Sequence, residues 1–308
     1  MSSQHHPILL FGATTASGAA CLEQTSGRPV VVAGRSRPPG WPMEHFLPID
    51  LGGMPPSDLG VIPEDAVLVS FAPIWSLAPW LSSLLKNHDS AAARHRFSGV
   101  VACSSSSVLT KRFAANRHDR ELVTRLLASE ESLEASCAQL NIPCRILRPT
   151  LIYGRAAGYG DRNLSALLAM MRRLPMLAIP AHTGQRQPIH ISQLAAAALH
   201  LADRPEDAPG RLALGGDECL SYRTMLERLQ QAARLHDAAD PAGRCALLKV
   251  PTLVFHLLAA PLLPISAKRF EAVLRMEADL GPFTPVHTLL GTPAQPFPLD
   301  PLAWGRGS

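Results

Sequence analysis

The chain has 308 residues, 47% of them hydrophobic, which suits one large or two small globular domains with a sizeable core. Its 29 Lys and Arg residues exceed its 25 Asp and Glu residues by only four, and the charges are spread along the chain. Binding of nucleic acid would need a clustered basic face, so we expect no nucleic-acid partner.

The six cysteines form no C-x-x-C motif and no His/Cys cluster at zinc spacing. Several lie within apolar runs, which predicts reduced core thiols, a cytoplasmic location and no metal site. The N-terminal residues "MSSQHHP" lack the charge pattern of a signal peptide, and the apolar run after them is only of strand length.

The first predicted strand is "ILLF", residues 8–11, and it leads into "GATTASG", residues 12–18. Glycines at such a position allow a tight turn from strand to helix and a close approach of pyrophosphate, and the N-terminus of the next helix attracts phosphate. A full G-x-x-G-x-x-G motif would have a glycine at position 15, where this chain has threonine. Taken alone, the loop is equally consistent with an ordinary Gly/Ser/Thr turn.

Short apolar runs then alternate with helical stretches through the first half of the chain. The clearest helix is Arg120–Leu140, in which leucines recur at helical spacing while Glu130 and its acidic neighbours mark a polar side. Continuous apolar strands between helices predict an α/β fold, a Rossmann-type doubly wound parallel sheet whose ligand binds at the carboxyl ends of the strands. The further predicted strands are Pro29–Ala33, Ala66–Phe71, Gly99–Cys103 and Cys144–Leu147.

The second half is less regular and predicts a smaller, mixed, helix-rich C-terminal lobe for the substrate. We expect residues 1–150 to form the dinucleotide-binding core, completed by about residues 185–215, with the lobe built from 151–184 and 216–308. The apolar stretch 246–266 is interrupted by three prolines and two polar side chains, which argues against a membrane span. A buried or pocket-lining helix pair is expected there, with a peripheral membrane contact as the alternative.

Seven stretches follow one another in a fixed order: "GATTASG", "VVVAGRSR", "LPIDLGG", "VLVSFAP", "GVVACSSSS", "CRILRPTLIYG" and "RQPIHISQLAAAAL". This succession resembles the extended and atypical short-chain dehydrogenases/reductases, the NAD-dependent epimerase/dehydratase family, over residues 7–215. "RILRPTLIYG" is the most specific piece. The resemblance implies an NAD or NADP cofactor and a small-molecule substrate, and the habit of the family favours a homodimer.

With the later motifs beside it, the first loop is expected to hold the pyrophosphate. By resemblance alone, two further pairs of residues lie near the adenine and under the cofactor, and one triplet lies beside the nicotinamide. The loop residues are Gly12, Thr14, Thr15, Ala16, Ser17 and Gly18, and the other segments are Asp50 and Leu51, Ala72 and Pro73, and Pro149, Thr150 and Leu151.

The basic turn Arg35, Ser36 and Arg37 bears on the choice between the two cofactors. A protein that prefers NAD usually has Asp or Glu about 20 residues after the first glycine, where it holds the ribose 2′-hydroxyl. No acid stands here, and a guanidinium can pair bidentately with a 2′-phosphate. The turn therefore favours NADP over NAD, with a solvated basic turn as the alternative.

The catalytic Tyr-x-x-x-Lys of the family is missing from this chain. None of its three tyrosines lies between Ser107 and Arg148, and Leu126 and Glu130 fall roughly where Tyr and Lys would stand. Leucine cannot transfer a proton, so the usual mechanism should not operate. The groups that could supply a different acid or base are the serine run Ser104–Ser107, with Ser104 and Ser105 as its first candidates, and Lys111, His118 and Tyr153.

The stretch "RQPIHISQ" also departs from the family, which usually has Asp where Ser192 and Gln193 stand. Ser192 can still cap the following helix. We expect Arg186 to contact an anionic group of the substrate, with a solvated surface arginine as the alternative, and His190 to face the substrate lobe.

Two functions remain open from the sequence. The first is an atypical short-chain dehydrogenase/reductase that acts on a small carbonyl or hydroxyl compound, or on a nucleotide-sugar-like substrate, by a non-standard acid/base arrangement; the apolar tail would suit a lipid-linked substrate. The second is a non-catalytic NADP(H)-binding sensor, regulator or assembly factor, which the missing Tyr and Lys favour.

Overall fold

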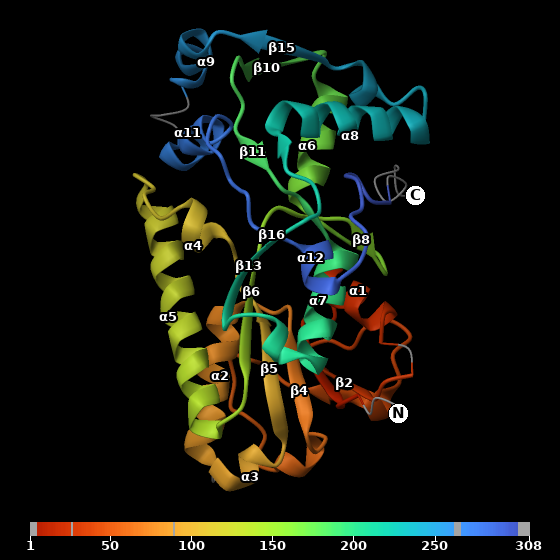
Figure 1. Ribbon diagram of the computed structural model, residues 1–308, viewed down its shortest axis with the longest axis vertical. Coiled ribbons are helices and arrows are strands. Elements are labelled where there is room, and N and C mark those ends of the chain that lie inside the picture. The colour runs from red at the N-terminus through yellow and green to blue at the C-terminus, as the bar shows by residue number, and fades with distance from the viewer. Residues whose placement is uncertain (1–4, 26, 89, 262–265, 301–308) are drawn as a thin grey trace.

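The computed structural model of the chain describes residues 5–25, 27–88, 90–261 and 266–300. Within these residues, eight strands form one sheet in the order β16-β13-β6-β5-β4-β1-β2-β3, and every neighbouring pair is parallel. This is the predicted doubly wound sheet (Figure 1). Its strands are β1 (Ile8–Phe11), β2 (Val30–Gly34), β3 (Phe46–Pro48), β4 (Ala66–Ser70), β5 (Phe97–Cys103), β6 (Cys144–Pro149), β13 (Arg211–Gly215) and β16 (Thr284–Pro285).

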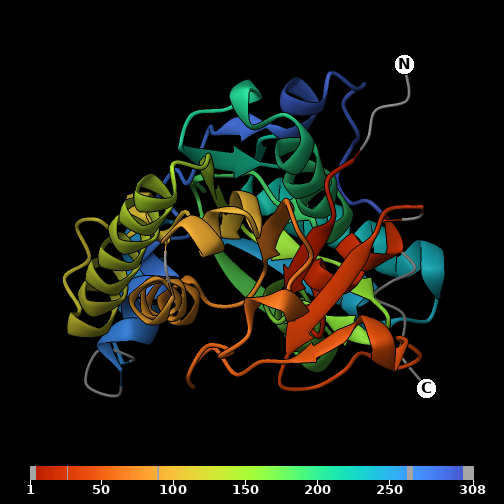
Figure 2. The same ribbon diagram turned by 90° about the horizontal axis from the view of Figure 1, so that it is seen from below.

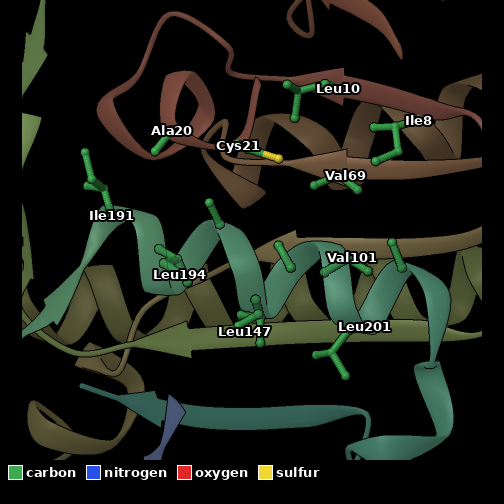
Figure 3. Close-up of a cluster of buried hydrophobic side chains, with 14 of the residues drawn as sticks. Ile8, Leu10, Ala20, Cys21, Val69, Val101, Leu147, Ile191, Leu194 and Leu201 are labelled. Atoms are coloured by element: carbon green, nitrogen blue, oxygen red, sulfur yellow. The ribbon is translucent and has the colours of Figure 1, made fainter. Parts of the chain in front are cut away.

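Helices cover both faces of the sheet, as Figure 2 shows, and alternate residues of each strand point to opposite faces. Ile8 and Leu10 face one hydrophobic cluster, drawn in Figure 3, whereas Leu9 and Phe11 face the other. Burial on both faces explains why the strands are continuous apolar runs in the sequence. The first face is covered by α1 (Ala16–Glu23), α7 (Ile191–Asp203) and α12 (Val286–Leu290), and the second by α2 (Ile74–Asn87), α3 (Ser90–Arg94) and α5 (Arg117–Leu140).

The sheet reverses its winding direction between β1 and β4. From β1 the chain moves outward through β2 to β3, and it then returns to β4 on the other side of β1. The loops that follow β1 and β4 leave the same edge of the sheet in opposite directions, which opens a crevice between them. This topology places the candidate site.

A smaller lobe lies above the carboxyl edge of the sheet (Figure 1). Its own hydrophobic cluster includes Tyr153, Leu168 and Met225. Its elements, with the short segments that connect it to the sheet, are α4 (Ser107–Thr110), β7 (Ile152–Tyr153), β8 (Arg155–Ala156), β9 (Tyr159–Gly160), α6 (Asn163–Arg173), β10 (Met176–Pro180), β11 (Gln185–Arg186), β12 (Ile189–His190), β14 (Leu220–Ser221), α8 (Tyr222–His236), β15 (Ala246–Val250), α9 (Thr252–Ala259) and α11 (Ala267–Leu274).

Two parts of the C-terminal region differ from the expectation. The strand β16 pairs with β13, and α12 packs on α7, so both belong to the sheet domain rather than to the lobe. The stretch 246–266 forms β15 and α9 instead of a buried helix pair, and residues 262–265 lie outside the described residues. None of the helices in the described part of the chain combines the length and the apolar character that a bilayer crossing requires.

The cysteines are unpaired throughout the described chain, and their environments differ. Cys21, Cys137 and Cys245 are buried, as predicted, but Cys219 is exposed. Burial raises the pKa of Cys21 to about 12, so this thiol stays protonated at neutral pH.

The contact between α1 and the end of β1 depends on a glycine. A Cβ atom on Gly18 would lie 2.1 Å from the carbonyl oxygen of Gly12, inside any allowed contact distance. We therefore expect Gly18→Ala to lower the free energy of unfolding by about 2–3 kcal/mol, because α1 must move away from β1. Urea denaturation followed by circular dichroism measures the change.

Gly210→Ala is the matched control. A Cβ atom there would meet its nearest neighbours at 3.9 Å, which is ordinary van der Waals contact. Its free energy of unfolding should stay within about 0.5 kcal/mol of that of the unmodified chain. Equal losses in the two variants would contradict the packing argument.

Candidate functional site

A cavity of about 520 Å³ opens at the point where the sheet reverses direction. Its walls come from the loop after β1 (residues 11–15), the end of β2 (32–36), the segment after β3 (49–52) and the loop after β4 (72, 73 and 76). Four segments that are far apart in the sequence thus meet at one edge of the sheet, where the doubly wound topology predicts a ligand.

The loop after β1 is held tightly by its neighbours. Gly12 has a φ of +80°, and a Cβ atom on it would lie 2.6 Å from the backbone nitrogen of Ala72. Only glycine satisfies both constraints, because other residues rarely adopt this φ and would clash with the loop after β4.

The structure explains the threonine at the position of the middle glycine. Thr15 is the N-cap of α1 and has a φ of −103°, which any residue can adopt. Its hydroxyl donates a hydrogen bond to the carbonyl of Gly12 at 2.8 Å and accepts one from the N–H of Gly18 at 3.1 Å. Thr15 therefore stabilises the loop and the first turn of the helix. Ala16, Ser17 and Gly18 lie in that turn and do not line the cavity.

The two arginines of the basic turn after β2 lie in different surroundings. Arg35 and Ser36 line the cavity, and the exposed Arg35 guanidinium has no hydrogen-bond or ion-pair partner among the described residues. The guanidinium of Arg37 instead donates to the backbone carbonyl of Trp41 and does not line the cavity.

The predicted adenine and cofactor-loop residues also lie at the cavity. Asp50 and Leu51 line its wall, and one Asp50 oxygen accepts the N–H of Gly52 at 3.0 Å. Ala72 and Pro73 form the opposite wall. Among the described residues that line the cavity are thus the glycine loop, the unpartnered guanidinium of Arg35 and the carboxylate of Asp50.

The segment predicted beside the nicotinamide is placed elsewhere. Pro149, Thr150 and Leu151 do not line this cavity. The hydroxyl of Thr150 donates to the carbonyl of Gln187, and its N–H donates to the carbonyl of Leu214 at 3.0 Å. These bonds fix the segment between β13 and the chain that leads into β12.

The serine run follows β5, and the hydroxyls of Ser104 and Ser105 have different hydrogen-bond partners. The hydroxyl of Ser104 donates to a carboxylate oxygen of Glu130 at 2.5 Å. The hydroxyl of Ser105 donates to that of Ser107 at 3.0 Å. Ser104 is thus paired with an acid, whereas Ser105 serves the turn into α4.

Glu130 is fully buried, which corrects the expectation that it lies on a polar side of the helix. The guanidinium of Arg148 on β6 donates to both of its oxygens, with Nε at 3.0 and 3.2 Å and Nη2 also bonded. Buried carboxylates require such a partner. The sequence did contain a signal for this pair: Arg148 is flanked by apolar residues in the strand "RILRPT", and a charged side chain in such a strand needs an acid as its partner.

Leu126, one turn before Glu130 on α5, is also buried. Neither of the two positions where the catalytic Tyr and Lys were expected therefore carries a phenol or an ammonium group.

Tyr153 lies in the core of the lobe rather than at the cavity. Its hydroxyl accepts the N–H of Leu299 at 3.0 Å, and its ring packs edge-on against His190 and Phe297. Burial raises its pKa above the ordinary value. Such a tyrosine is a poor proton donor at neutral pH, and this placement supports a structural role.

His190 is the N-cap of α7, the position that the sequence analysis gave to Ser192. Its Nδ1 accepts the N–H of Ser192 at 3.3 Å, and the side chain of Gln193 accepts the N–H of His190 at 3.1 Å. Burial lowers the pKa of His190 and keeps it neutral. Its Nε2 atom is buried without a hydrogen-bond partner among the described residues.

Arg186 is buried, so it is neither a solvated arginine nor open to an anion. It donates to the carbonyls of Gln185 at 2.7 Å and Ala278 at 2.8 Å, and also to that of Arg275. Its guanidinium also lies 5.1 Å from the centre of the Tyr222 ring. These contacts hold the C-terminal segment against β11.

Lys111 belongs to a buried charge cluster between the sheet domain and the lobe. Its ammonium lies 2.8 Å from the fully buried carboxylate of Asp119, which Asn116 and Arg275 also contact. Burial would raise the pKa of Asp119, but the hydrogen bonds and charges of these partners outweigh burial and keep the pKa below its usual value. The other proposed base, His118, is exposed.

No protein-family model and no curated protein sequence matches this chain. Solved structures do match it. MoeE5 in complex with UDP-glucose and NAD has a TM-score of 0.59 and 14% identity over 97% of this chain and 96% of that chain. The chain has the fold of NAD-dependent nucleotide-sugar epimerases and dehydratases.

Two further structures support this assignment of the fold. The UDP-N-acetylglucosamine 4-epimerase from Bacillus cereus has a TM-score of 0.54 and 14% identity, covering 80% of this chain and 87% of that chain. The NAD-dependent NDP-hexosamine 5,6-dehydratase TunA, involved in tunicamycin biosynthesis, has a TM-score of 0.51 and 21% identity, covering 80% and 84%. The Rossmann-type fold predicted from the ordered motifs is confirmed.

The ion pair between Glu130 and Arg148 should dominate the stability of this region. Glu130→Gln leaves the Arg148 guanidinium, whose side chain is only 11% exposed, without its carboxylate partner, and we expect the free energy of unfolding to fall by about 3 kcal/mol. Guanidinium chloride denaturation measures the loss. As a control, Glu121→Gln removes the exposed partner of Arg117 on the same helix and should change nothing measurable. A stable Glu130→Gln variant would show that the pair is dispensable.

Proposed function

We propose that this chain binds NADP(H) more tightly than NAD(H) in the cavity at the sheet reversal, and that it acts on a small carbonyl or hydroxyl compound or on a nucleotide-sugar-like substrate. The observation that carries the proposal is that one cavity brings together the glycine loop, Arg35 and Asp50. These are the three groups that a dinucleotide with a 2′-phosphate needs: a pyrophosphate loop, a cation and an acceptor for the adenine amino group.

Each wall of the cavity has a defined role in this proposal. The N-terminus of α1 and the loop around Gly12 would hold the pyrophosphate, because backbone N–H groups and the helix dipole favour negative charge there. Arg35 would pair with the 2′-phosphate, for which its unpartnered guanidinium is suited. Asp50 would accept from the adenine amino group through the oxygen that Gly52 does not use.

Ser104 and Glu130 offer a proton path that replaces the missing tyrosine and lysine. A bound nicotinamide would supply hydride transfer. As a substrate hydroxyl is oxidised, Ser104 would take its proton and pass its own proton to Glu130, to which it already donates at 2.5 Å. Arg148 would hold the Glu130 carboxylate in this orientation, and because its charge favours the ionised form, Glu130 would keep the proton only briefly.

The role of Arg35 can be measured by calorimetry. Arg35→Ala should weaken NADPH binding by about 10- to 100-fold, the value of a charge-assisted pairing with phosphate, and change NADH binding little. Arg37→Ala is the matched control two residues away, because the Arg37 guanidinium is bonded to Trp41 and does not line the cavity. Equal losses for NADPH and NADH in Arg35→Ala would refute the 2′-phosphate role, and no binding of either nucleotide to the unmodified chain would refute the cofactor proposal.

The second candidate is a non-catalytic NADP(H)-binding sensor, regulator or assembly factor. The observation that favours it is that a buried leucine and an ion-paired glutamate occupy the places where the sequence analysis put the catalytic pair.

Steady-state assays separate the two candidates. Turnover of NADPH or NADP with a panel of UDP-sugars and simple carbonyl compounds would support the enzyme. Ser104→Ala should then lower kcat by about 10²- to 10⁴-fold without changing the affinity for NADPH, whereas Ser105→Ala, which removes only the bond to Ser107, should change kcat little. Tight NADPH binding with no turnover of any compound would support the sensor instead.

A further inference from the structure

One face of the lobe exposes an unusual number of large apolar side chains. On α9, Leu253, Leu257 and Leu258 are 72%, 65% and 60% exposed, and Val254 beside them is also exposed. We call these four residues, with Leu248 of β15 and Met176 of β10, the apolar face. Contiguous apolar surface of this kind on a folded domain commonly marks a binding surface.

The outward face of α9 is apolar, which is the reverse of the usual amphipathic pattern of a surface helix. Its outward residues, at positions 253, 254, 257 and 258, share one helical face and are all apolar. Phe255 points inward and is buried, so the helix is anchored on the lobe by one aromatic side chain. A helix that only covered a core would have polar residues on its outer face.

The apolar face continues from the helix onto the neighbouring strands. β10 and β15 pair in parallel, with Met176 opposite Ala246 and Leu248 opposite Ala178, and α9 begins directly after β15 and packs on β10. Figure 1 shows these three elements at the end of the lobe that is furthest from the central sheet. The face therefore lies away from the cofactor cavity.

The charges around the apolar face are basic. The sequence has no Asp or Glu between residues 241 and 270, nor between 162 and 202. Arg173, Arg244 and Lys249 are exposed at or beside the two strands and make no ion pair with any described residue. Two acids near α9 already have partners: Glu277 is bonded to His256 at 2.6 Å, and Glu271 of α11, which packs on α9, accepts from Asn116 at 2.7 Å.

We propose that the apolar face docks on an anionic lipid bilayer. The leucines of α9 would enter the boundary between headgroups and acyl chains, while Arg173, Arg244 and Lys249 would lie at the anionic headgroups. The eight residues of α9 are too few to cross a bilayer, so the contact is peripheral. The combination of exposed leucines with unpaired basic side chains favours this occupant over a protein partner, because an apolar protein surface would not need the excess positive charge.

Vesicle flotation with the full chain tests the proposal. The protein should float with vesicles of phosphatidylcholine and phosphatidylglycerol and bind pure phosphatidylcholine vesicles more weakly. The double substitution of Leu253→Ser and Leu257→Ser should weaken binding to the mixed vesicles by about tenfold or more, because two large apolar side chains no longer leave water.

Leu235→Ser is the matched control for the leucine substitutions. Leu235 is 77% exposed, but it lies on α8, away from α9 in Figure 1. This variant should bind vesicles as the unmodified chain does. All variants should keep the circular dichroism spectrum and the melting temperature of the unmodified chain, which shows that they fold and separates this test from the cofactor proposal.

Charge reversal tests the second half of the proposal. The double substitution of Arg173→Glu and Lys249→Glu should lower binding to the mixed vesicles several-fold and leave binding to pure phosphatidylcholine vesicles unchanged. Absence of flotation with the mixed vesicles, or an equal loss in Leu235→Ser, would overturn the proposal. So would a dimer in analytical ultracentrifugation that the double leucine substitution dissociates, since a second copy of the chain would then cover the face.

Discussion

The close approach of α1 to the end of β1 determines the geometry of the whole candidate site. It exists because Gly18 has no Cβ to meet the Gly12 carbonyl and because Gly12 can turn at a positive φ beneath the loop after β4. The helix N-terminus is thereby fixed at the one edge of the sheet where the winding reverses. Thr15 then stabilises the turn through its hydroxyl, so the loop keeps its conformation without the middle glycine. The end of β2 and the segment after β3 complete a cavity around this fixed point.

The buried pair of Glu130 and Arg148 has a comparable influence on the chemistry. It joins α5 to β6 and gives Ser104 an acceptor. A buried carboxylate with a fixed counter-charge can receive a proton from a neighbouring hydroxyl, but it cannot replace a cationic lysine beside a phenol. The same pair therefore supports both open functions, a changed proton path and a loss of catalysis.

In and beside the lobe, side chains that the motifs of the resemblance predicted to be functional make structural contacts instead. Arg186, His190 and Tyr153 are all polar, and all three follow motifs of the resemblance, yet each is buried and bonded to backbone or to its neighbours. The contacts of Arg186 and Tyr153 secure the C-terminal segment that supplies β16 to the sheet, and those of His190 cap α7. The exposed leucines of α9 show the opposite pattern, because apolar residues in a stretch that reads as core lie at the surface.

The sequence by itself determined the parallel sheet and the place of the glycine loop. Both depend on local features, which are continuous apolar runs, the spacing of Gly12 and Gly18, and motifs in a fixed order. Only the tertiary structure decided which polar residues are available to a ligand. Arg35 and Arg37 are two residues apart in one basic turn, but one lines the cavity and the other is bonded to Trp41. Helical periodicity likewise predicts a solvated Glu130, but in the folded chain β6 places Arg148 against it. The availability of a side chain depends on contacts between residues that are distant in the chain, and helical or strand periodicity does not record those contacts.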